Sequence, residues 1–184
     1  MYEFVNKLML SRQLLFEEGE IRLLGEPSVM LIPASCFLDL SDKLLEDDGA
    51  VHVYVAGKNA GKELFKLISH YTIDPLKTIK FGTQVFNISG FGKVQIINVN
   101  LESKRALFRM RDSLYRNRRS NEPMCHFVRG MFAGFTQNVM KAEMDCVETH
   151  CVAMGSEVCE FVIKKREDFN KGKEIVKKQL GLVD

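Results

Sequence analysis

The sequence has no long apolar stretch, no charge excess and no low-complexity segment. No apolar run approaches the roughly 18 residues needed to cross a bilayer, so no membrane span is predicted. The 26 basic and 24 acidic side chains nearly cancel, to a formal charge of +2, and direct binding to nucleic acid is not expected. No Pro/Ser-rich linker divides the 184 residues, which favours a single domain over residues 1–184.

Motifs of several enzyme classes are also missing. There is no phosphate-binding GxxxxGK[ST] loop, no nucleophile elbow, no Ser-His-Asp order and no glycine-rich dinucleotide fingerprint after a strand. The N-terminal stretch "MYEFVNKLML" lacks the pattern of a signal peptide, so we expect a cytoplasmic protein. We predict no catalytic residues and expect a binding module rather than an enzyme.

Cysteine is present, but not in a pattern that suits disulfides. Five cysteines are an odd number, and a chain of this length can build a core without cross-links. Four of the five fall between Cys125 and Cys159, with no C-x-x-C pair. In a reducing compartment such clustering indicates metal binding, redox chemistry or buried packing.

Apolar patterning in the first half predicts strands followed by helices. A hairpin is expected about Glu18-Gly19, with a third strand at residues 28–32. Ser35 is expected to cap a helix that ends before Gly49. Residues 51–57 read as a strand, and two further helices are expected at residues 59–71 and, capped by Asp74 with Pro75 in the first turn, 75–89.

The second half alternates hairpins and helices. Its predicted elements are a hairpin of residues 93–101 and 105–116, a helix opened by Asn121 and Pro123, two strands about Gly155 within residues 142–165, and a helix from Asp168 to Gly181. In the middle helix, Gly130 and Gly134 share a face that permits close approach of another element. The order of elements predicts an α+β fold with an antiparallel sheet and packed helices.

The stretch "ETHCVAMGSEVCEF", residues 148–161, carries the densest group of metal-binding side chains. Cys151 and Cys159 each lie four residues from Gly155, so a turn there makes them cross-strand partners, close enough to bind one ion. In a flat strand Glu148 faces the other side, and only a bulge at Thr149 or His150 turns its carboxylate toward the sulfurs. Parity alone leaves Glu148 and His150 open as ligands.

Cys125 is the expected source of a further ligand. It lies at the first turn of the middle helix, whose N-terminus favours a thiolate. Three thiolates with one carboxylate or imidazole form a closed tetrahedral shell, typical of structural zinc. His126 and His150 are alternative ligands or supports of the ligands, and the competing interpretation is that the cysteines are buried packing residues.

These residues also carry a family resemblance. "C-H-F-V-R-G", a following "G-F", and "E-x-x-C-x-x-x-G-x-x-x-C-x-F" resemble the 4-vinyl reductase domain family, a hydrocarbon-binding domain also found as the sensor of aromatic-responsive bacterial regulators. The resemblance implies an α+β fold related to the ligand-binding folds of nitric-oxide sensors and of a Golgi-transport complex. In phenol-sensing members three cysteines and a glutamate bind zinc, which implies Cys125, Glu148, Cys151 and Cys159 as ligands here.

The resemblance further implies a homodimer with an apolar pocket beside the zinc. Phenol sensors hold the ligand hydroxyl with a histidine and a tryptophan, and this chain has no tryptophan, so we do not expect phenol itself as the ligand. The apolar residues that we predict to line the pocket are Phe81, Val85, Phe86, Phe108, Met110, Phe127, Met131 and Phe132. Residues 1–17 are an N-terminal extension and a candidate dimer contact, and residues 165–184 are expected to end in a helix.

The leading hypothesis is therefore a zinc-stabilised domain that binds or senses a small hydrophobic molecule. One alternative is an enzyme or enzyme subunit that acts on a tetrapyrrole-like substrate, in line with the vinyl reductases of the family. The other is an interaction protein of the trafficking or scaffold type. Fold kinship alone does not decide between these functions.

Overall fold

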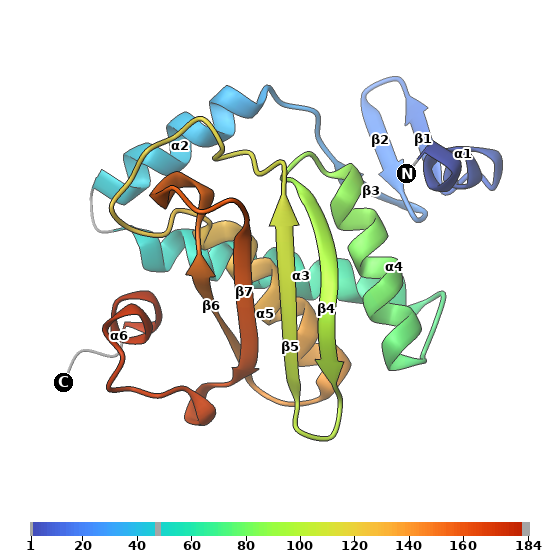
Figure 1. Ribbon diagram of the computed structural model, residues 1–184. Helices are drawn as coiled ribbons and strands as arrows, with labels where there is room; N and C mark the ends of the chain where they lie inside the picture. Colours follow the sequence, from blue (N-terminus) through green and yellow to red (C-terminus); the bar gives the residue numbers. More distant parts are fainter. Residues whose placement is uncertain (1, 47–48, 182–184) are drawn as a thin grey trace.

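The computed structural model describes residues 2–46 and 49–181, apart from the side chains of residues 27 and 28, and it has the predicted α+β architecture. Position 1 of the predicted N-terminal extension and positions 182–184 of the predicted C-terminal helix lie outside this description. The main sheet is antiparallel with the strand order β4-β5-β7-β6 (Figure 1), formed by β4 (Lys93–Asn100), β5 (Arg105–Arg111), β6 (Met144–His150) and β7 (Cys159–Lys165).

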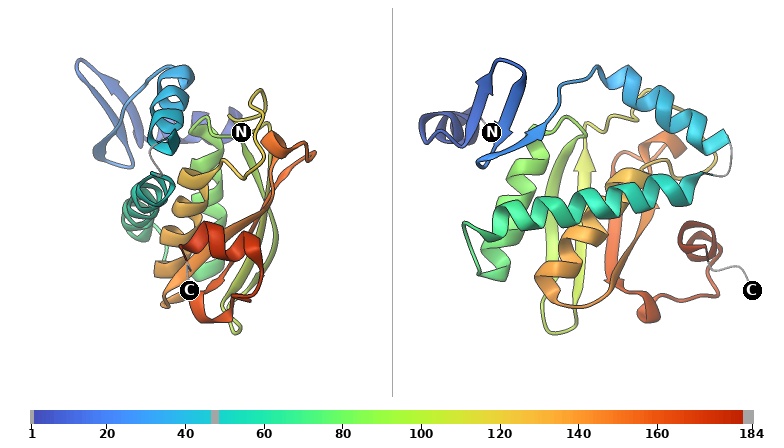
Figure 2. Two further views of the ribbon diagram at one scale, coloured as in Figure 1. Left: turned by 90° about the vertical axis from the view of Figure 1, so that its left-hand side faces the viewer. Right: turned by 180° about the vertical axis from the view of Figure 1, so that it is seen from behind.

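Two crossed helices cover one face of this sheet. Helix α5 (His126–Met140) lies on the strands, and α3 (Ala50–Ser69) crosses it on the outside, which gives three layers (Figure 2). The crossing is tight because glycines meet there: a Cβ on Gly134 would overlap the Lys58 carbonyl, and one on Gly57 would overlap that of Phe127. The predicted close approach at this face of α5 is confirmed.

The other helices surround this centre. Helix α4 (Pro75–Ile88) lies beside β4, and its start is as predicted, because the Asp74 side chain accepts a 2.7 Å hydrogen bond from the Lys77 backbone N–H. Helix α2 (Ala34–Glu46) lies near the β6–β7 turn, and α6 (Glu174–Leu180) lies beside the edge strand β6. Over the described residues, no helix is both long and apolar enough to cross a membrane.

The N-terminal residues form a small unit beside α4. It comprises α1 (Tyr2–Leu10) and a three-stranded sheet of β1 (Leu14–Glu17), β2 (Glu20–Leu23) and β3 (Glu26–Val29). The predicted hairpin about Glu18-Gly19 is confirmed. Phe4 of α1 packs edge-to-face on Phe81 of α4 at 5.9 Å, so the unit is attached to the main domain through aromatic rings.

One predicted element is of the wrong type. Residues 51–57 form the first turns of α3 and not a strand. Their alternation of β-branched and aromatic residues resembles a half-buried strand, but Gly57 and Gly61 let the segment pack as a helix on α5. Tertiary packing therefore overrides the local propensity.

Several predicted boundaries also shift. Ser35 lies inside the first turn of α2, and α5 begins at His126, after the predicted opening at Asn121. The third strand ends at Val29, because the chain then runs toward α2. Helix α6 starts only at Glu174, since residues 166–168 form a separate 3₁₀ turn.

Candidate functional site

A bulge in strand β6 determines which way Glu148 points. Glu148 lies opposite Phe161 of β7, but His150 lies opposite Glu160, so Thr149 is an extra residue on β6. The bulge predicted at Thr149 or His150 is confirmed. As a result Glu148 faces the core side of the sheet and is completely buried.

Cys151 and Cys159 meet where the two strands separate. After His150 the chain enters a 3₁₀ turn at Val152–Met154, and Gly155 closes it with a φ of 94°, a left-handed conformation that suits glycine. The Val152 backbone N–H donates to the Cys159 Sγ at 3.4 Å. The turn about Gly155 therefore brings both sulfurs to one place, as the spacing predicts.

Cys125 is the N-cap residue of α5 and joins that helix to the hairpin. Its backbone N–H donates a 3.0 Å hydrogen bond to the Glu148 Oε2. The first N–H groups of a helix have no intrahelical partner, so this bond satisfies one of them. Its Sγ lies 3.7 Å from the Cys159 Sγ.

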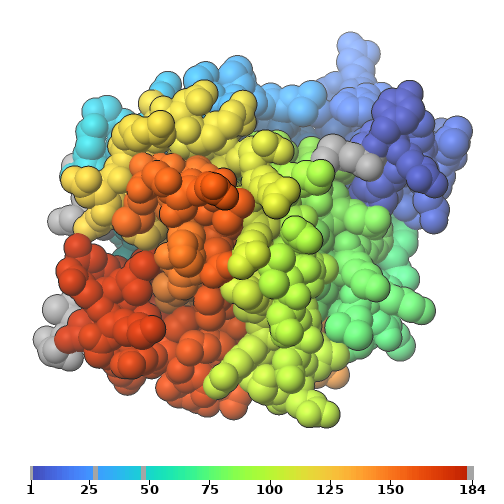
Figure 3. Space-filling model, in the orientation of Figure 1, coloured from blue at the N-terminus to red at the C-terminus, as the bar shows by residue number. Residues whose placement is uncertain are grey.

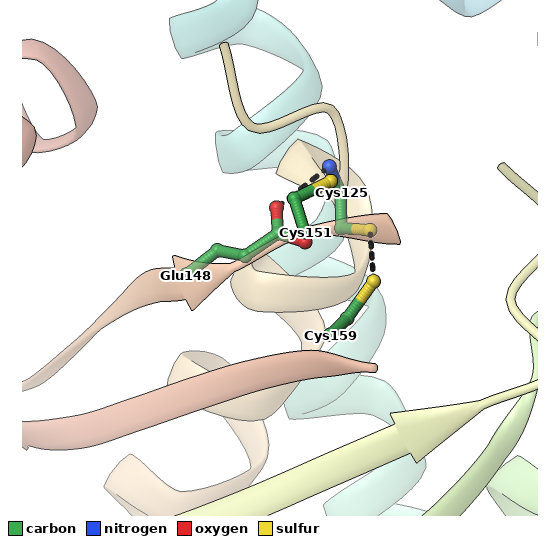
Figure 4. Close-up of side chains that lie close together, drawn as sticks. All are labelled: Cys125, Glu148, Cys151 and Cys159. Atoms are coloured by element: carbon green, nitrogen blue, oxygen red, sulfur yellow. Dashed lines mark hydrogen bonds between the residues drawn. The ribbon is translucent and has the colours of Figure 1, made fainter. Parts of the chain in front are cut away.

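Together these four residues form a compact group that can hold a metal ion. One ligand atom from each of Cys125, Glu148, Cys151 and Cys159 lies within 4.8 Å of all the others, and all four residues are buried. Figure 4 shows the side chains turned toward one another from α5 and from β6, β7 and their connecting turn. The Glu148 Oε1 has no hydrogen-bond partner among the residues that the structure describes.

Neither neighbouring histidine belongs to this group. His126 turns toward Arg129, whose guanidinium lies 3.2 Å from its Nδ1. His150 points outward, with 59% of its side chain exposed, and its Nδ1 lies 3.5 Å from Glu160. Of the two residues that strand parity left open, Glu148 is the one that reaches the sulfurs.

Burial and mutual proximity shift the proton affinities of the group. Burial raises the pKa of Glu148 to about 8, and the charge on Cys151 adds to this shift. Burial also raises the pKa of Cys125. Hydrogen bonds from the thiols of Cys125 and Cys159 lower the pKa of Cys151. Without a cation the group thus favours few negative charges, whereas a bound divalent cation would favour all four ligands in their anionic form.

A buried arginine lies beside the group. Arg129 is only 2% exposed, and its guanidinium donates to the Cys146 carbonyl at 3.2 Å and lies 4.2 Å from the centre of the Tyr54 ring. Burial lowers the pKa of Arg129, while the neighbouring Glu148 and Asp145 oppose that shift. A buried cation needs anionic surroundings, and the Cys/Glu group supplies them.

A small apolar cavity lies farther along α5. Phe132 is at its centre, with ring centroids 5.1 Å from Phe86, 5.2 Å from Phe108 and 5.1 Å from Phe161. The cavity has a volume of about 20 Å³, which is room for about one water molecule. It is lined by Leu64, Ile79, Gly82, Thr83, Phe86, Phe108, Met131, Phe132 and Phe135.

Four of the eight predicted pocket residues line this cavity, namely Phe86, Phe108, Met131 and Phe132. Phe81 lines a different hollow, between α1 and α4. Val85 and Met110 are buried in the core, and Phe127 packs between Phe37 and Phe91. The sequence prediction missed Leu64, Ile79, Gly82 and Thr83, which periodicity places on α3 and α4 without showing that both helices face one cavity.

Comparison with known families identifies the segment that carries the group. Residues 108–165, from β5 to β7, match the 4-vinyl reductase domain. The resemblance recognised from the sequence is therefore confirmed over these residues, which include the four side chains of the buried group. A relative by sequence is the uncharacterized protein MJ0150 of Methanocaldococcus jannaschii, 26% identical over 138 residues, or 73% of this chain and 76% of the relative.

Solved structures share the fold. The phenol-responsive sensory domain of the transcription activator PoxR, determined with phenol, superposes with a TM-score of 0.79 at 21% identity, over 93% of this chain and 94% of that one. A trafficking protein particle complex subunit 3 from Naegleria fowleri, covalently bound to palmitic acid, gives 0.55 at 12% identity, over 71% and 91%. The predicted α+β fold and its kinship with a transport-complex fold are confirmed.

Proposed function

We propose that this protein is a ligand-binding domain of the sensor type, in which one structural zinc ion holds helix α5 to the β6–β7 hairpin. The buried group of three cysteines and one glutamate carries the proposal, since its ligand atoms lie within 4.8 Å of one another and come from separate segments of the chain. An ion there would join the start of α5 to the end of the sheet.

The donor set suits zinc. Thiolates are soft ligands that favour zinc over magnesium or calcium. Zn–S bonds of about 2.3 Å in a tetrahedron place the sulfurs about 3.8 Å apart. The 3.7 Å between the sulfurs of Cys125 and Cys159 agrees with that spacing. The free Oε1 of Glu148 has no other partner in the described part of the chain, so it is available as a ligand.

A structural role is favoured over a catalytic one. Four protein ligands complete a tetrahedral shell, whereas catalytic zinc keeps one position open for water or substrate. All four residues are buried, so substrate has no direct access to them. When bound, the ion would supply only a fixed positive charge, and the chain's own part is to orient the ligands through the bulge at Thr149 and the bond between Cys125 and Glu148.

The aromatic cavity on α5 is the proposed site for a small hydrophobic molecule. Its volume is far below the roughly 300–1,000 Å³ of typical ligand pockets, so a ligand must displace rings to enter. Thr83 is the one hydroxyl residue of its lining, and its Oγ1 already donates to the Ile79 carbonyl at 2.8 Å. With that hydroxyl engaged, an apolar ligand fits this lining better than a phenol.

The likeness to the PoxR sensory domain supports a role in which ligand occupancy is passed to a partner. The partner that we propose is a second copy of this chain. Helix α1 buries Leu8 against the main domain but exposes Tyr2 by 82% and Leu10 by 87%. Exposed apolar side chains of this size favour an interface on the N-terminal unit.

The metal is tested by elemental analysis of protein purified without a metal-affinity tag. We expect one zinc per chain in the wild type and none in Cys151→Ser. Cys146→Ser is the matched control, because Cys146 is equally buried on β6 but outside the group, and it should keep its zinc. Wild-type protein without stoichiometric metal would refute the proposed zinc site.

Ligand binding is tested by native mass spectrometry and calorimetry with benzene, toluene and phenol. We expect benzene and toluene to bind more tightly than phenol. Tighter binding of phenol would mean that the ligand finds a polar partner outside this cavity. The dimer is tested by light scattering after chromatography, where Leu10→Arg should lower the molar mass to that of one chain.

A further inference from the structure

The edge of the main sheet is completed by a side chain of helix α6. Strand β6 is an edge strand, so the outward backbone groups of Glu148 have no neighbouring strand. The Glu148 N–H donates to the Gln179 Oε1 at 2.8 Å, and the Gln179 Nε2 donates to the Glu148 carbonyl at 2.8 Å. The Gln179 amide therefore replaces one peptide unit of a missing strand.

This pair of bonds is buried. Gln179 is 5% exposed and Glu148 is fully buried, so water cannot replace the amide. Leaving a buried donor or acceptor without a partner costs about 1–3 kcal/mol for each group. The backbone of Glu148, at the edge of the bulge, therefore depends on Gln179 for its position.

Few other contacts hold α6 in place. A groove of about 1230 Å³ separates it from the loop before Cys125 and from α2, and Figure 3 shows the hollow between the C-terminal residues in red and that loop in yellow. Val176 and Leu180 pack on Val147 and Phe169 in a small second core.

Two charged residues complete the attachment of α6. The Arg166 guanidinium donates to the Leu180 carbonyl at 2.9 Å and to the Asp145 carboxylate at 3.3 Å. Lys178 forms an exposed 2.8 Å ion pair with Glu122 across the groove. Exposed pairs of this kind contribute little, so Gln179 is the polar link from α6 to the buried group.

We propose that Gln179 is a positioning residue for the metal site and that docking of α6 is thermodynamically coupled to metal binding. This inference rests on the proposed function. Metal binding fixes Glu148 in the geometry that Gln179 recognises, and docked α6 holds Glu148 in the geometry that the metal requires. By linkage, each event must strengthen the other by the same factor.

The first test compares metal affinity in the wild type, Gln179→Leu, Gln179→Glu and Lys178→Ala, by competition with a chromophoric chelator for Zn²⁺. Gln179→Leu removes both hydrogen bonds and should weaken binding about 10–100-fold, the usual cost of losing a residue that orients a ligand. Gln179→Glu keeps the acceptor for the Glu148 N–H but loses the donor, and should fall between. Lys178→Ala, the neighbouring control, should bind as the wild type does.

The second test measures hydrogen exchange of the α6 amides with and without Zn²⁺. In the wild type, metal removal should speed exchange in α6 by the factor that Gln179→Leu costs in affinity. In Gln179→Leu, exchange should no longer respond to metal. The visible absorption of the Co²⁺-loaded protein should also change in Gln179→Leu but not in Lys178→Ala, which a merely structural role of Gln179 would not produce.

The outcomes separate this inference from the proposed function. Wild-type protein that binds no metal overturns both. Wild-type protein that binds zinc, with Gln179→Leu within twofold of its affinity or with α6 exchange unaffected by metal, overturns the inference alone. If Gln179→Leu does not fold, Gln179→Glu and the exchange measurement on the wild type still decide it.

Discussion

Helix α5 serves two unlike regions along its length. Its first residue, Cys125, joins a polar group in which the backbone and side chains of Glu148 and the cysteines are oriented by specific hydrogen bonds. Its middle, from Met131 to Phe135, lines a cavity formed almost entirely by apolar and aromatic side chains. The first region is determined by directed bonds and the second by shape.

This difference predicts how each region tolerates change. Removing one ligand from the polar group leaves the others buried and uncompensated, so the loss is large. Replacing one ring of the cavity by another apolar side chain changes volume but leaves no polar group without a partner, so the loss is smaller. Selectivity for a metal and tolerance for varied hydrophobic ligands can thus occur on one helix.

The largest expected effect follows from stripping the metal. With free metal at a thousand times its dissociation constant, binding stabilises the fold by about 4 kcal/mol. For a chain of this size that is a fall in Tm of about 10 °C on adding a chelator. Calorimetry checks this, and exchange protection should fall at Cys125 and Glu148 before it falls in the cavity. An equal loss in both regions would contradict their independence.

The next effect strikes the support that both regions share. Gly134→Ala places a methyl group on the Lys58 carbonyl of α3, and the helices must separate. We expect a loss of about 3 kcal/mol in the free energy of unfolding, measured by urea denaturation. Gly172→Ala is the control, since its Cβ would meet only the Asn170 side chain at 3.1 Å, and it should be nearly neutral.

A smaller effect is expected within the cavity alone. Phe135→Leu should cost about 1–2 kcal/mol and enlarge the space beside Gly82, where the Phe135 ring now lies. Benzene should then raise the Tm of the variant more than that of the wild type, with zinc content unchanged. Phe65→Leu alters a ring that packs edge-to-face on Phe135 without lining the cavity, and should not enhance benzene binding.

The smallest effect concerns the outer face of β7, one residue from Cys159. The Arg109 Nε donates to the Glu160 carboxylate at 2.8 Å, and this bond lowers the pKa of Glu160. A lowered carboxyl pKa gives stability that is present above the unfolded value and lost as pH falls through the folded value. Arg109→Gln should cost at most about 0.5 kcal/mol at pH 7, because solvent screens the pair, and nothing at low pH. A larger loss, with loss of zinc, would mean that the outer face supports the metal group.

The polar group was far more predictable from the sequence than the cavity. Spacing about Gly155 aligned Cys151 with Cys159, and strand parity required the bulge that the structure has at Thr149. The choice of Glu148 over His150 came from the family resemblance, because a bulge reverses the parity on which a purely local argument depends.

The cavity and the outer helix were harder to predict for a common reason. Residues 51–57 have strand-like alternation, and their helical state depends on contact with glycines of α5 that lie far away in the sequence. Leu64 and Ile79 line the cavity only because α3 and α4 both converge on α5. Periodicity identifies the apolar face of a helix but not which other helix that face meets. The role of Gln179, likewise, leaves no local pattern in the sequence.

The positions of the four buried ligand candidates along the chain give them a place in the order of synthesis. All fall between Cys125 and Cys159, and the sulfurs of these two residues, 3.7 Å apart in space, are 34 residues apart in the chain. A growing polypeptide emerges from its N-terminus, so α3, α4 and the first long hairpin are made before the last of these residues exists. Under the proposed coordination, a chain that stops short of Cys159 has an incomplete ligand set. Zinc would then distinguish a nascent chain that has passed this point from one that has not.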